Sequence, residues 1–373
     1  MDPQAAAAAW IAELPAAARA ASGPGTTWTE ALGVGQLLVF LVLCGVLLRT
    51  GVPARLGASA QARGFSQWIT DAGSAFVFGV LAILAAAPLT ALSSWRSEPA
   101  RWLRALLDAS LGDLLLVLLA ALPAAAALLL IRRAPKAWGL ILGGVLGALA
   151  FAALWLPYHQ ASGPAALPGA PRGPARAGLI QLLHETRVPA SDVYISANPG
   201  IDADVTGTGQ SAQVVISRGF WTKASPEELR ASVGHLIGHY RHHDQLSLAL
   251  LLAGLTLGAF AGLQLLAPPL ARRLGFDGPG DPAALPLLAM LFVLLASASA
   301  VIERGFDRAI NVRADQFSLD HAKEPDGLAL ALLREWKGER VDPSPLEEAI
   351  FYDHPSLKSR LVHAMSWKAA HSG

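Results

Sequence analysis

Two histidines one helical turn apart are the residues whose types and spacing most suggest chemistry. His235 and His239 are separated by Leu236, Ile237 and Gly238. On a helix, side chains four positions apart point in the same direction, and two imidazoles at that spacing can share one zinc ion. The same spacing is typical of a solvated or hydrogen-bonded pair without metal. The pattern alone therefore leaves both interpretations open.

The composition restricts the other ligands and partners. The single cysteine, Cys44, lies inside an apolar run, which excludes an intramolecular disulfide and a cysteine-based zinc site. Any metal must be held by histidine, carboxylate or amide side chains. The 29 basic and 28 acidic residues give a formal charge of +1, which supplies no long-range attraction for nucleic acid. We therefore expect no nucleic-acid partner.

Further polar residues follow the last long apolar run. Asn311 and Asp315 are one helical turn apart in the sequence NVRAD, and His354 precedes a proline, with Arg360 beyond it. Together with the histidine pair, these residues favour a metal site more strongly than the spacing of the pair alone.

The order of these features resembles that of the integral-membrane zinc metallopeptidases related to the CaaX prenyl endopeptidase. Apolar runs, a polar insert, an H-x-x-G-H helix, further apolar runs, an A-D helix and an H-P segment follow one another over about residues 30–370. In the family that this order resembles, the helix reads H-E-x-x-H. The third zinc ligand there is the glutamate of E-x-x-A-D. The resemblance also implies an edge strand in the insert that holds substrate in extended form.

Two departures from the family pattern bear on catalysis and on metal binding. Leu236 stands where the resemblance places the general-base glutamate, and a leucine cannot carry a proton from water to a leaving amine. Asn311 stands where the third ligand is a glutamate, and its neutral amide oxygen is a poorer partner for a divalent ion. We therefore expect a degenerate motif that binds zinc weakly or not at all.

Other residues offer partial replacements or match family positions. Asp315 matches a residue that supports a ligand histidine, and it is also an alternative ligand, as are His242 and His243. The resemblance places His354 and Arg360 near the active site, although a structural turn followed by a surface arginine explains them equally well.

A substrate surface and a function follow from the same resemblance. Asp202, Ala203 and Asp204 fall where the family has its substrate-facing strand, and a loop tip is the alternative. The residues favour a degenerate, catalytically impaired peptidase that binds membrane-associated polypeptides. The alternative is an active zinc metalloendopeptidase with an unorthodox general base. Membrane lipid and a membrane-associated polypeptide are the expected partners.

The histidine pair requires a helix to position it. Ser225 and Glu228 form a capping box with Pro226 at the first helical position, so a helix is expected to start there. We expect it to continue directly into the next apolar run. Upstream, residues 193–196 and 213–217 are expected to form two short strands of a hairpin.

The composition also indicates a membrane protein. Hydrophobic residues make up 53% of the chain, charged residues 15%, and the mean hydropathy is +0.42. Six uncharged stretches are long enough to cross a bilayer as helices. These are Ala31 to Leu48, Ala72 to Trp95, Leu114 to Ile131, Ala137 to Tyr158, Leu246 to Ala271 and Pro282 to Ile302. The fourth and fifth carry glycines at four-residue spacing, which is typical of close helix packing.

We therefore predict a mainly α, polytopic helical membrane protein with a small α+β metallopeptidase-like insert. The expected segments are an N-terminal segment (1–30), four transmembrane helices (31–158), the insert (159–245), two transmembrane helices (246–302) and a C-terminal helical segment (303–373). An even number of crossings places both termini on one side. Arginines after the first and third runs favour an outer insert, whereas the resemblance favours a cytoplasmic one. The expected location is a bacterial inner membrane.

Overall fold

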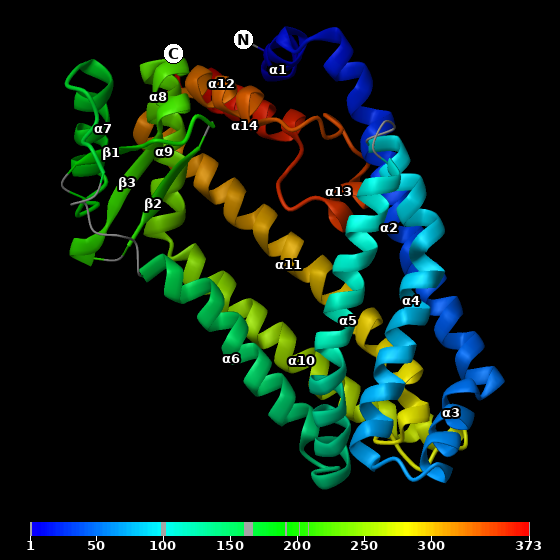
Figure 1. The fold of residues 1–373 in the computed structure, drawn as a ribbon. Helices are drawn as coiled ribbons and strands as arrows, with labels where there is room; N and C mark the ends of the chain where they lie inside the picture. Colours follow the sequence, from blue (N-terminus) through cyan, green and yellow to red (C-terminus); the bar gives the residue numbers. More distant parts are fainter. Residues whose placement is uncertain are drawn as a thin grey trace. The chain divides into compact units, whose positions relative to one another are not determined.

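The computed structural model describes residues 2–97, 102–159, 167–190, 192–200, 202–207 and 209–372. Residues 160–166, at the expected start of the insert, and 98–101 lie outside that description. The chain divides into two compact units, and the elements are labelled in Figure 1. Unit 1 consists of Met1–Thr26, Leu149–Leu252 and Val301–Gly373, and unit 2 of Thr27–Ala148 and Ala253–Ala300.

Unit 2 is built from long apolar helices. Six helices among the described residues are long and apolar enough to cross a membrane, as expected. They are α2 (Ala16–Thr50), α4 (Gln67–Ser97), α5 (Trp102–Arg133), α6 (Trp138–His159), α10 (Asp244–Arg273) and α11 (Leu285–Ala322). The short helix α3 (Val52–Ala62) and the turn η3 (Pro282–Ala284) belong to connections between them. The protein is therefore a multi-pass membrane protein.

The glycine row of α6 permits close helix packing, whereas most of the α10 row does not contact another helix. A Cβ on Gly143 would lie 2.9 Å from the Phe260 Cβ and 3.0 Å from the Leu257 Cα. A Cβ on Gly254 or Gly258 would meet nothing within 4 Å. The close packing expected from small residues thus holds for the α6 face.

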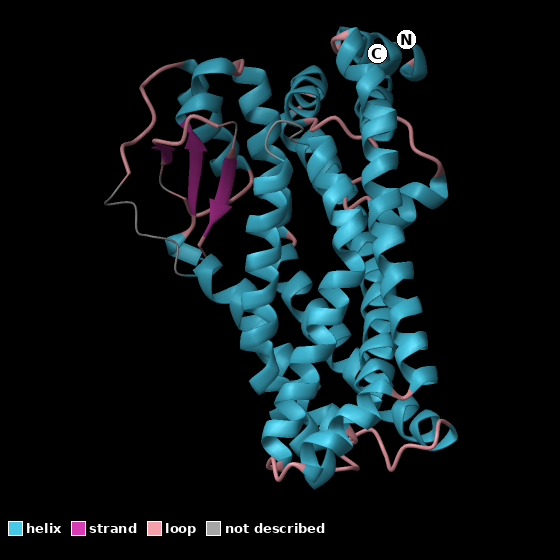
Figure 2. Ribbon diagram, turned by 45° about the vertical axis from the view of Figure 1, so that its right-hand side comes forward, coloured by secondary structure: helices cyan, strands magenta, loops and turns pink. Residues whose placement is uncertain are grey.

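Unit 1 contains one small sheet (Figure 2), formed by β1 (Val193–Ser196), β2 (Ala203–Thr206) and β3 (Gln213–Ser217) in the order β1-β3-β2. The expected hairpin of β1 with β3 is wrong, because these two strands pair in parallel. The antiparallel partner of β3 is β2, a strand that lies in the connection between β1 and β3. Helix α7 (Pro174–Glu185), the turn η2 (Gly209–Ser211) and α8 (Arg218–Lys223) complete this region.

Helix α9 (Pro226–Arg241) carries the histidine pair and begins as predicted. The Ser225 hydroxyl accepts from the Glu228 N–H at 3.1 Å, and the capping box is complete. The Glu228 carboxylate is buried and ion-paired with Arg334. The expected continuation into the membrane helix is wrong, because His243 has a φ of 56° and a separate helix α10 begins at Asp244. The chain therefore turns immediately after the histidine pair.

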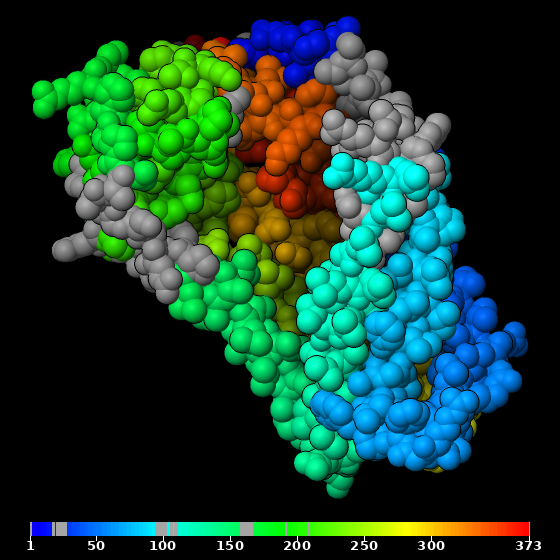
Figure 3. Space-filling view, viewed as in Figure 1, coloured from blue at the N-terminus to red at the C-terminus, as the bar shows by residue number. Residues whose placement is uncertain are grey.

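The C-terminal helices form a core together with the N-terminal helix. Helices α12 (Pro325–Glu335), α13 (Pro345–Phe351) and α14 (Leu357–His371) follow α11, and α1 (Pro3–Glu13) packs against α14 and α12. Ala7 of α1, Leu328 of α12 and Leu361 of α14 are all buried in one apolar cluster. Figure 3 shows the blue N-terminal residues beside the orange C-terminal ones. The two ends of the sequence thus share one core.

Candidate metal centre

The two histidines of α9 face each other. The Nε2 atoms of His235 and His239 are 3.0 Å apart, and the ring centroids are 4.6 Å apart. The two side chains are partly exposed, by 15% and 25% respectively. The predicted one-turn spacing therefore brings the same nitrogen of each ring to one point.

His235 is oriented by an ion pair from two other helices. Its Nδ1 lies 2.7 Å from the Asp315 Oδ1 of α11. The Arg360 Nε and Nη2 of α14 donate to both oxygens of the same carboxylate, each at 2.7 Å. Asp315 is 2% exposed as a side chain, so this bidentate bond satisfies a buried charge. The structure thus brings His235, Asp315 and Arg360 together, as the resemblance implied.

His239 has an equivalent arrangement that sequence reasoning missed. Its Nδ1 lies 2.9 Å from the Asp244 Oδ2, and Arg313 of α11 is ion-paired with the other oxygen of that carboxylate. Asp244 is 3% exposed as a side chain. On an unbroken helix Asp244 would lie five positions beyond His239 and point elsewhere. The turn at His243 is what returns its carboxylate to the ring.

Close packing of α9 on α11 is possible because two glycines precede the histidines. A Cβ on Gly234 would lie 2.9 Å from the Ser318 Oγ, and one on Gly238 would lie 3.0 Å from the Ala314 Cα. The Ser318 hydroxyl donates to the Ala231 carbonyl at 2.7 Å and joins the same two helices. The glycines therefore allow the α11 carboxylate to reach His235.

The protonation state of His235 suits a cation. Burial lowers the pKa of His235 to about 4, against the opposing hydrogen bond with Asp315, so this ring is neutral at pH 7, as a metal ligand must be. A carboxylate beside each Nδ1 favours the ring proton on that nitrogen. A tetrahedral zinc at 2.0–2.1 Å from both nitrogens requires them to be roughly 3.3 Å apart. The observed 3.0 Å is close to that separation.

Leu236 and Asn311 contribute no charge to this centre. Leu236 packs against the apolar core beneath the sheet. Asn311 is 8% exposed, and its amide nitrogen donates to the Asp307 carbonyl of its own helix at 2.9 Å. Among the residues that the structure describes, no three His, Cys, Asp or Glu side chains are placed to hold one metal ion together. The two imidazoles are therefore the side chains of this centre with ring nitrogens that face each other.

The other candidate ligands are engaged elsewhere. The His242 Nδ1 lies 2.7 Å from the Gly238 carbonyl, and its ring contacts Phe317 edge-on. His243 occupies the turn between α9 and α10. Asp315 is bound by His235 and Arg360. These contacts agree with a supporting rather than a ligating position for Asp315.

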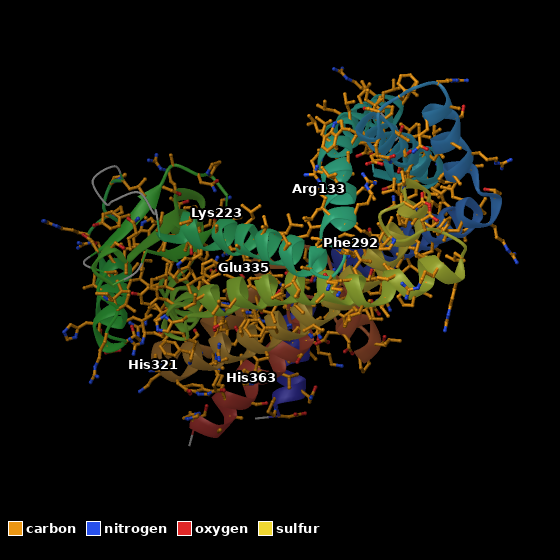
Figure 4. The ribbon with its side chains drawn as sticks, turned by 90° about the horizontal axis from the view of Figure 1, so that it is seen from below. Arg133, Lys223, Phe292, His321, Glu335 and His363 are labelled. Atoms are coloured by element: carbon orange, nitrogen blue, oxygen red, sulfur yellow. The ribbon has the colours of Figure 1, made fainter. Side chains whose placement is uncertain are left out.

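His354 lies among carboxylates that the sequence did not single out. Its Nδ1 is 2.5 Å from the Asp353 Oδ1. Asp307 of α11 interacts electrostatically with both His239 and His354. Glu335, at the end of α12 and labelled in Figure 4, interacts with Arg360, Asp315 and His354. Asp307 lies one helical turn before Asn311, a spacing that could have indicated it, whereas Glu335 has no such signal.

The expected substrate strand lies beside the histidine helix. Ala203 and Asp204 belong to β2, an edge strand of the sheet, and Asp202 immediately precedes it. Asp204 is opposite Val215 in β3. β2 contacts α9. The three residues thus lie on or beside an edge strand that contacts α9.

Comparison with known proteins places these features in a family. The family model described as "Peptidase family M48" matches residues 177–368, slightly more than half of the chain. The chain is 27% identical over 200 residues to the "Uncharacterized metalloprotease YhfN" of Bacillus subtilis (strain 168), which covers 50% of this chain and 46% of that one. It is 26% identical over 190 residues to the "Protease HtpX homolog" of Streptococcus equi subsp. zooepidemicus (strain MGCS10565), covering 47% and 62%.

A solved structure shares the fold. The structure described as "Crystal Structure of S. mikatae Ste24p" superimposes with a TM-score of 0.50 and 18% identity, over 74% of this chain and 67% of that one. The two curated relatives above are matched over about half to two thirds of their own lengths. The similarity therefore extends from the histidine region into the membrane helices at the level of fold.

Proposed function

Since this chain belongs to peptidase family M48, we propose that it is a membrane-embedded member whose hydrolytic step is impaired and which binds membrane-associated polypeptides. The carrying observation is Leu236, which packs into the apolar core at the position where the family resemblance requires a carboxylate. A peptidase needs a group that takes a proton from water and delivers it to the leaving amine. A leucine side chain has no such group.

The metal side of the proposal rests on His235 and His239. Their Nε2 atoms would hold a zinc ion, which when bound supplies Lewis-acid assistance and a more acidic water. The Asp315 and Asp244 carboxylates keep the two rings oriented. Asn311 offers an amide where the family has a charged ligand, so zinc binds more weakly than in a site with a third carboxylate.

The binding surface is the edge formed by Asp202, Ala203 and Asp204. An edge strand leaves backbone N–H and C=O groups unpaired, and an extended peptide can bind by adding a strand to it. β2 contacts α9, so a chain bound along this edge would lie beside the helix that carries the histidine pair. The protein resides in a bacterial inner membrane, between lipid and its polypeptide clients.

The test restores the two missing carboxylates. Native chain, Leu236→Glu plus Asn311→Glu, and the matched control Leu236→Gln plus Asn311→Gln are purified in detergent. Zinc content and cleavage of an unfolded membrane-associated substrate are measured for each. We expect negligible cleavage by the native chain and by the control, and a rise in both zinc and cleavage only with the glutamates. A positioned acid–base group contributes about 10²- to 10⁴-fold to such rates.

The opposite outcome identifies an active enzyme. Chelator-sensitive cleavage by the native chain that His235→Ala abolishes would refute the impaired-peptidase proposal. In that case Asp307, which interacts electrostatically with His239 and His354, is the first candidate for the unorthodox base. Asp307→Asn would then remove cleavage while Asp192→Asn, in an ion pair with Arg176, would not.

A further inference from the structure

One end of unit 2 carries an excess of basic residues. The connections after α2, α5 and α10 lie at the same end of this unit in Figure 1, and η3 contacts both α3 and α4. Together these connections and the adjoining helix ends carry eight basic and three acidic residues. The basic residues are Arg49, Arg55, Arg63, Arg132, Arg133, Lys136, Arg272 and Arg273, and the acidic ones are Asp71, Asp277 and Asp281. Positive charge therefore predominates where these helices end.

A cavity lies among these connections. Its volume is about 710 Å³, and ligand sites typically have volumes of roughly 300–1,000 Å³. Its wall consists of α3, the ends of α5 and α10, and the connection that precedes η3. Two arginines, Arg132 and Arg272, and two aspartates, Asp277 and Asp281, line it. The cavity is thus built within unit 2 and offers two guanidinium groups to a ligand.

Arg132 is held in place and still has free donors. Its Nη1 donates to the Gly280 carbonyl at 2.7 Å, and its Nη2 is ion-paired with Asp71, whose side chain is fully buried. A Cβ on Gly280 would lie 2.6 Å from the Arg132 Cγ, so the glycine lets this connection cross the arginine stem. A guanidinium has five N–H donors, and the Arg132 Nε has no partner among the described residues. Arg132 therefore presents an oriented donor.

Arg272 supplies a charge that no carboxylate neutralises. Its guanidinium forms no hydrogen bond or ion pair within the part of the chain that the structure describes. It lines the cavity, whereas the next residue, Arg273, is equally exposed but does not. Of the two aspartates in the wall, Asp281 accepts a backbone N–H at the start of η3 at 2.8 Å. An anion in the cavity would therefore meet Arg272 opposed by one carboxylate, that of Asp277.

An apolar recess adjoins the cavity and favours a lipid over a free anion. The recess shares Pro53 and Pro282 with the cavity and includes Val77, Phe78 and Leu81 of α4 in its wall. Its volume of about 20 Å³ is too small to enclose an acyl chain, which would instead lie along its surface. Basic pockets between membrane helices bind anionic lipid head groups. The polar cavity and the apolar recess thus match the two parts of a phospholipid.

We propose that this cavity binds the phosphate group of an anionic phospholipid, with Arg272 and Arg132 as its donors and an acyl chain against the recess of α4. Phosphate oxygens accept strong, charge-assisted hydrogen bonds from guanidinium groups. The alternative is a pair of arginines that only extend from helix ends into water, and it predicts no difference between Arg272 and Arg273. The proposal is independent of the impaired-peptidase proposal, because every residue of the cavity belongs to unit 2.

The experiment measures lipid binding by the full chain, delipidated in detergent at physiological ionic strength, where exposed charges are largely screened. Native chain, Arg272→Gln and the matched control Arg273→Gln are titrated with phosphatidylglycerol that carries a fluorescent label on an acyl chain. We expect Arg272→Gln to weaken binding by about tenfold or more, because it removes a hydrogen bond to a charged group. Arg273→Gln removes the same charge outside the cavity and should change affinity by less than about twofold.

Asp277→Asn provides a test with the opposite sign. It removes the opposing carboxylate from the wall and should raise the affinity for phosphatidylglycerol by roughly fivefold, the effect of one charge near a lipid phosphate. A damaged fold cannot produce such a gain. Phosphatidylcholine, whose head group has no net charge, should bind more weakly than phosphatidylglycerol. Glycerol 3-phosphate, which has the phosphate without acyl chains, should compete only at much higher concentration.

Four results would overturn the proposal. Equal losses in Arg272→Gln and Arg273→Gln would indicate a general attraction of lipid to a basic surface. Equal affinities for phosphatidylglycerol and phosphatidylcholine would show that charge is not recognised. Unchanged or weaker binding by Asp277→Asn would place the phosphate outside the cavity. Competition by glycerol 3-phosphate as strong as that by the lipid would identify a soluble phosphate compound as the ligand instead.

Discussion

At the scale of single residues, the candidate metal centre has carboxylates that orient its histidines but lacks the two charged residues of the family pattern. His235 and His239 are held by buried carboxylates, yet Leu236 and Asn311 provide neither a proton carrier nor an anionic ligand. Each buried carboxylate is costly without its guanidinium partner. The ion pairs are therefore the most informative residues to perturb.

Arg360→Gln should destabilise the protein strongly. It leaves the Asp315 carboxylate, 2% exposed, without its guanidinium, and removing one partner of a buried pair typically costs about 3–5 kcal/mol. The measurement is the unfolding temperature in detergent, followed by tryptophan fluorescence. Arg176→Gln, which breaks the more exposed pair with Asp192, is the control and should have a small effect. Equal effects of the two changes would contradict a special role for the buried pair.

At the scale of elements, the approach of α9 to α11 decides whether the centre forms. Gly238 faces the backbone of α11, where the Ala314 Cα would lie 3.0 Å from an added Cβ. A helix backbone cannot move aside like the end of a flexible side chain. The glycine before His239 is therefore a requirement of packing rather than of backbone conformation.

Gly238→Ala should weaken both folding and metal binding. Overpacking of this kind typically costs about 1–3 kcal/mol, and any separation of α9 from α11 lengthens the 2.7 Å contact of His235 with Asp315. Unfolding temperature and Zn²⁺ affinity are measured together. Gly254→Ala is the control, because a Cβ there meets nothing within 4 Å and alanine is the better helix former. A Gly238→Ala protein indistinguishable from the native one would show that the helices can move apart freely.

Elements with local signals could be predicted from the sequence, whereas contacts between distant residues could not. The Ser225 capping box and the six apolar runs are encoded within a few consecutive residues. The turn at His243 was missed because its positive φ occurs at a residue other than glycine. The parallel pairing of β1 with β3 and the ion pair of Arg313 with Asp244, 69 positions apart, depend on the tertiary fold. The sequence therefore indicated the paired histidines but not the Asp244 carboxylate that contacts His239.

At the scale of the whole molecule, the shared core of the N- and C-terminal helices constrains the membrane topology. Ala7 of α1 is buried against residues of α12 and α14 such as Leu328 and Leu361. Segments that share a core lie on the same side of the bilayer. This is the arrangement that six crossings between them produce.

Topology reporters should therefore agree at the two ends. A reporter fused before Asp2 and one fused after Ser372 are expected to give the same side, while one inserted in the connection after α5, at Pro135, should give the opposite side. Positive-inside counting and the family resemblance assign that side differently, and the reporters decide between them. A split between the two ends would contradict both the even number of crossings and the shared core.

The turn at His243 has one more consequence. Asp244 supports His239 and is also the first residue of the fifth membrane-crossing helix. The histidine pair is thereby joined to this helix by one residue rather than by a flexible linker. If the protein binds polypeptides as proposed, its selection of them would therefore depend on how near the bilayer a segment emerges.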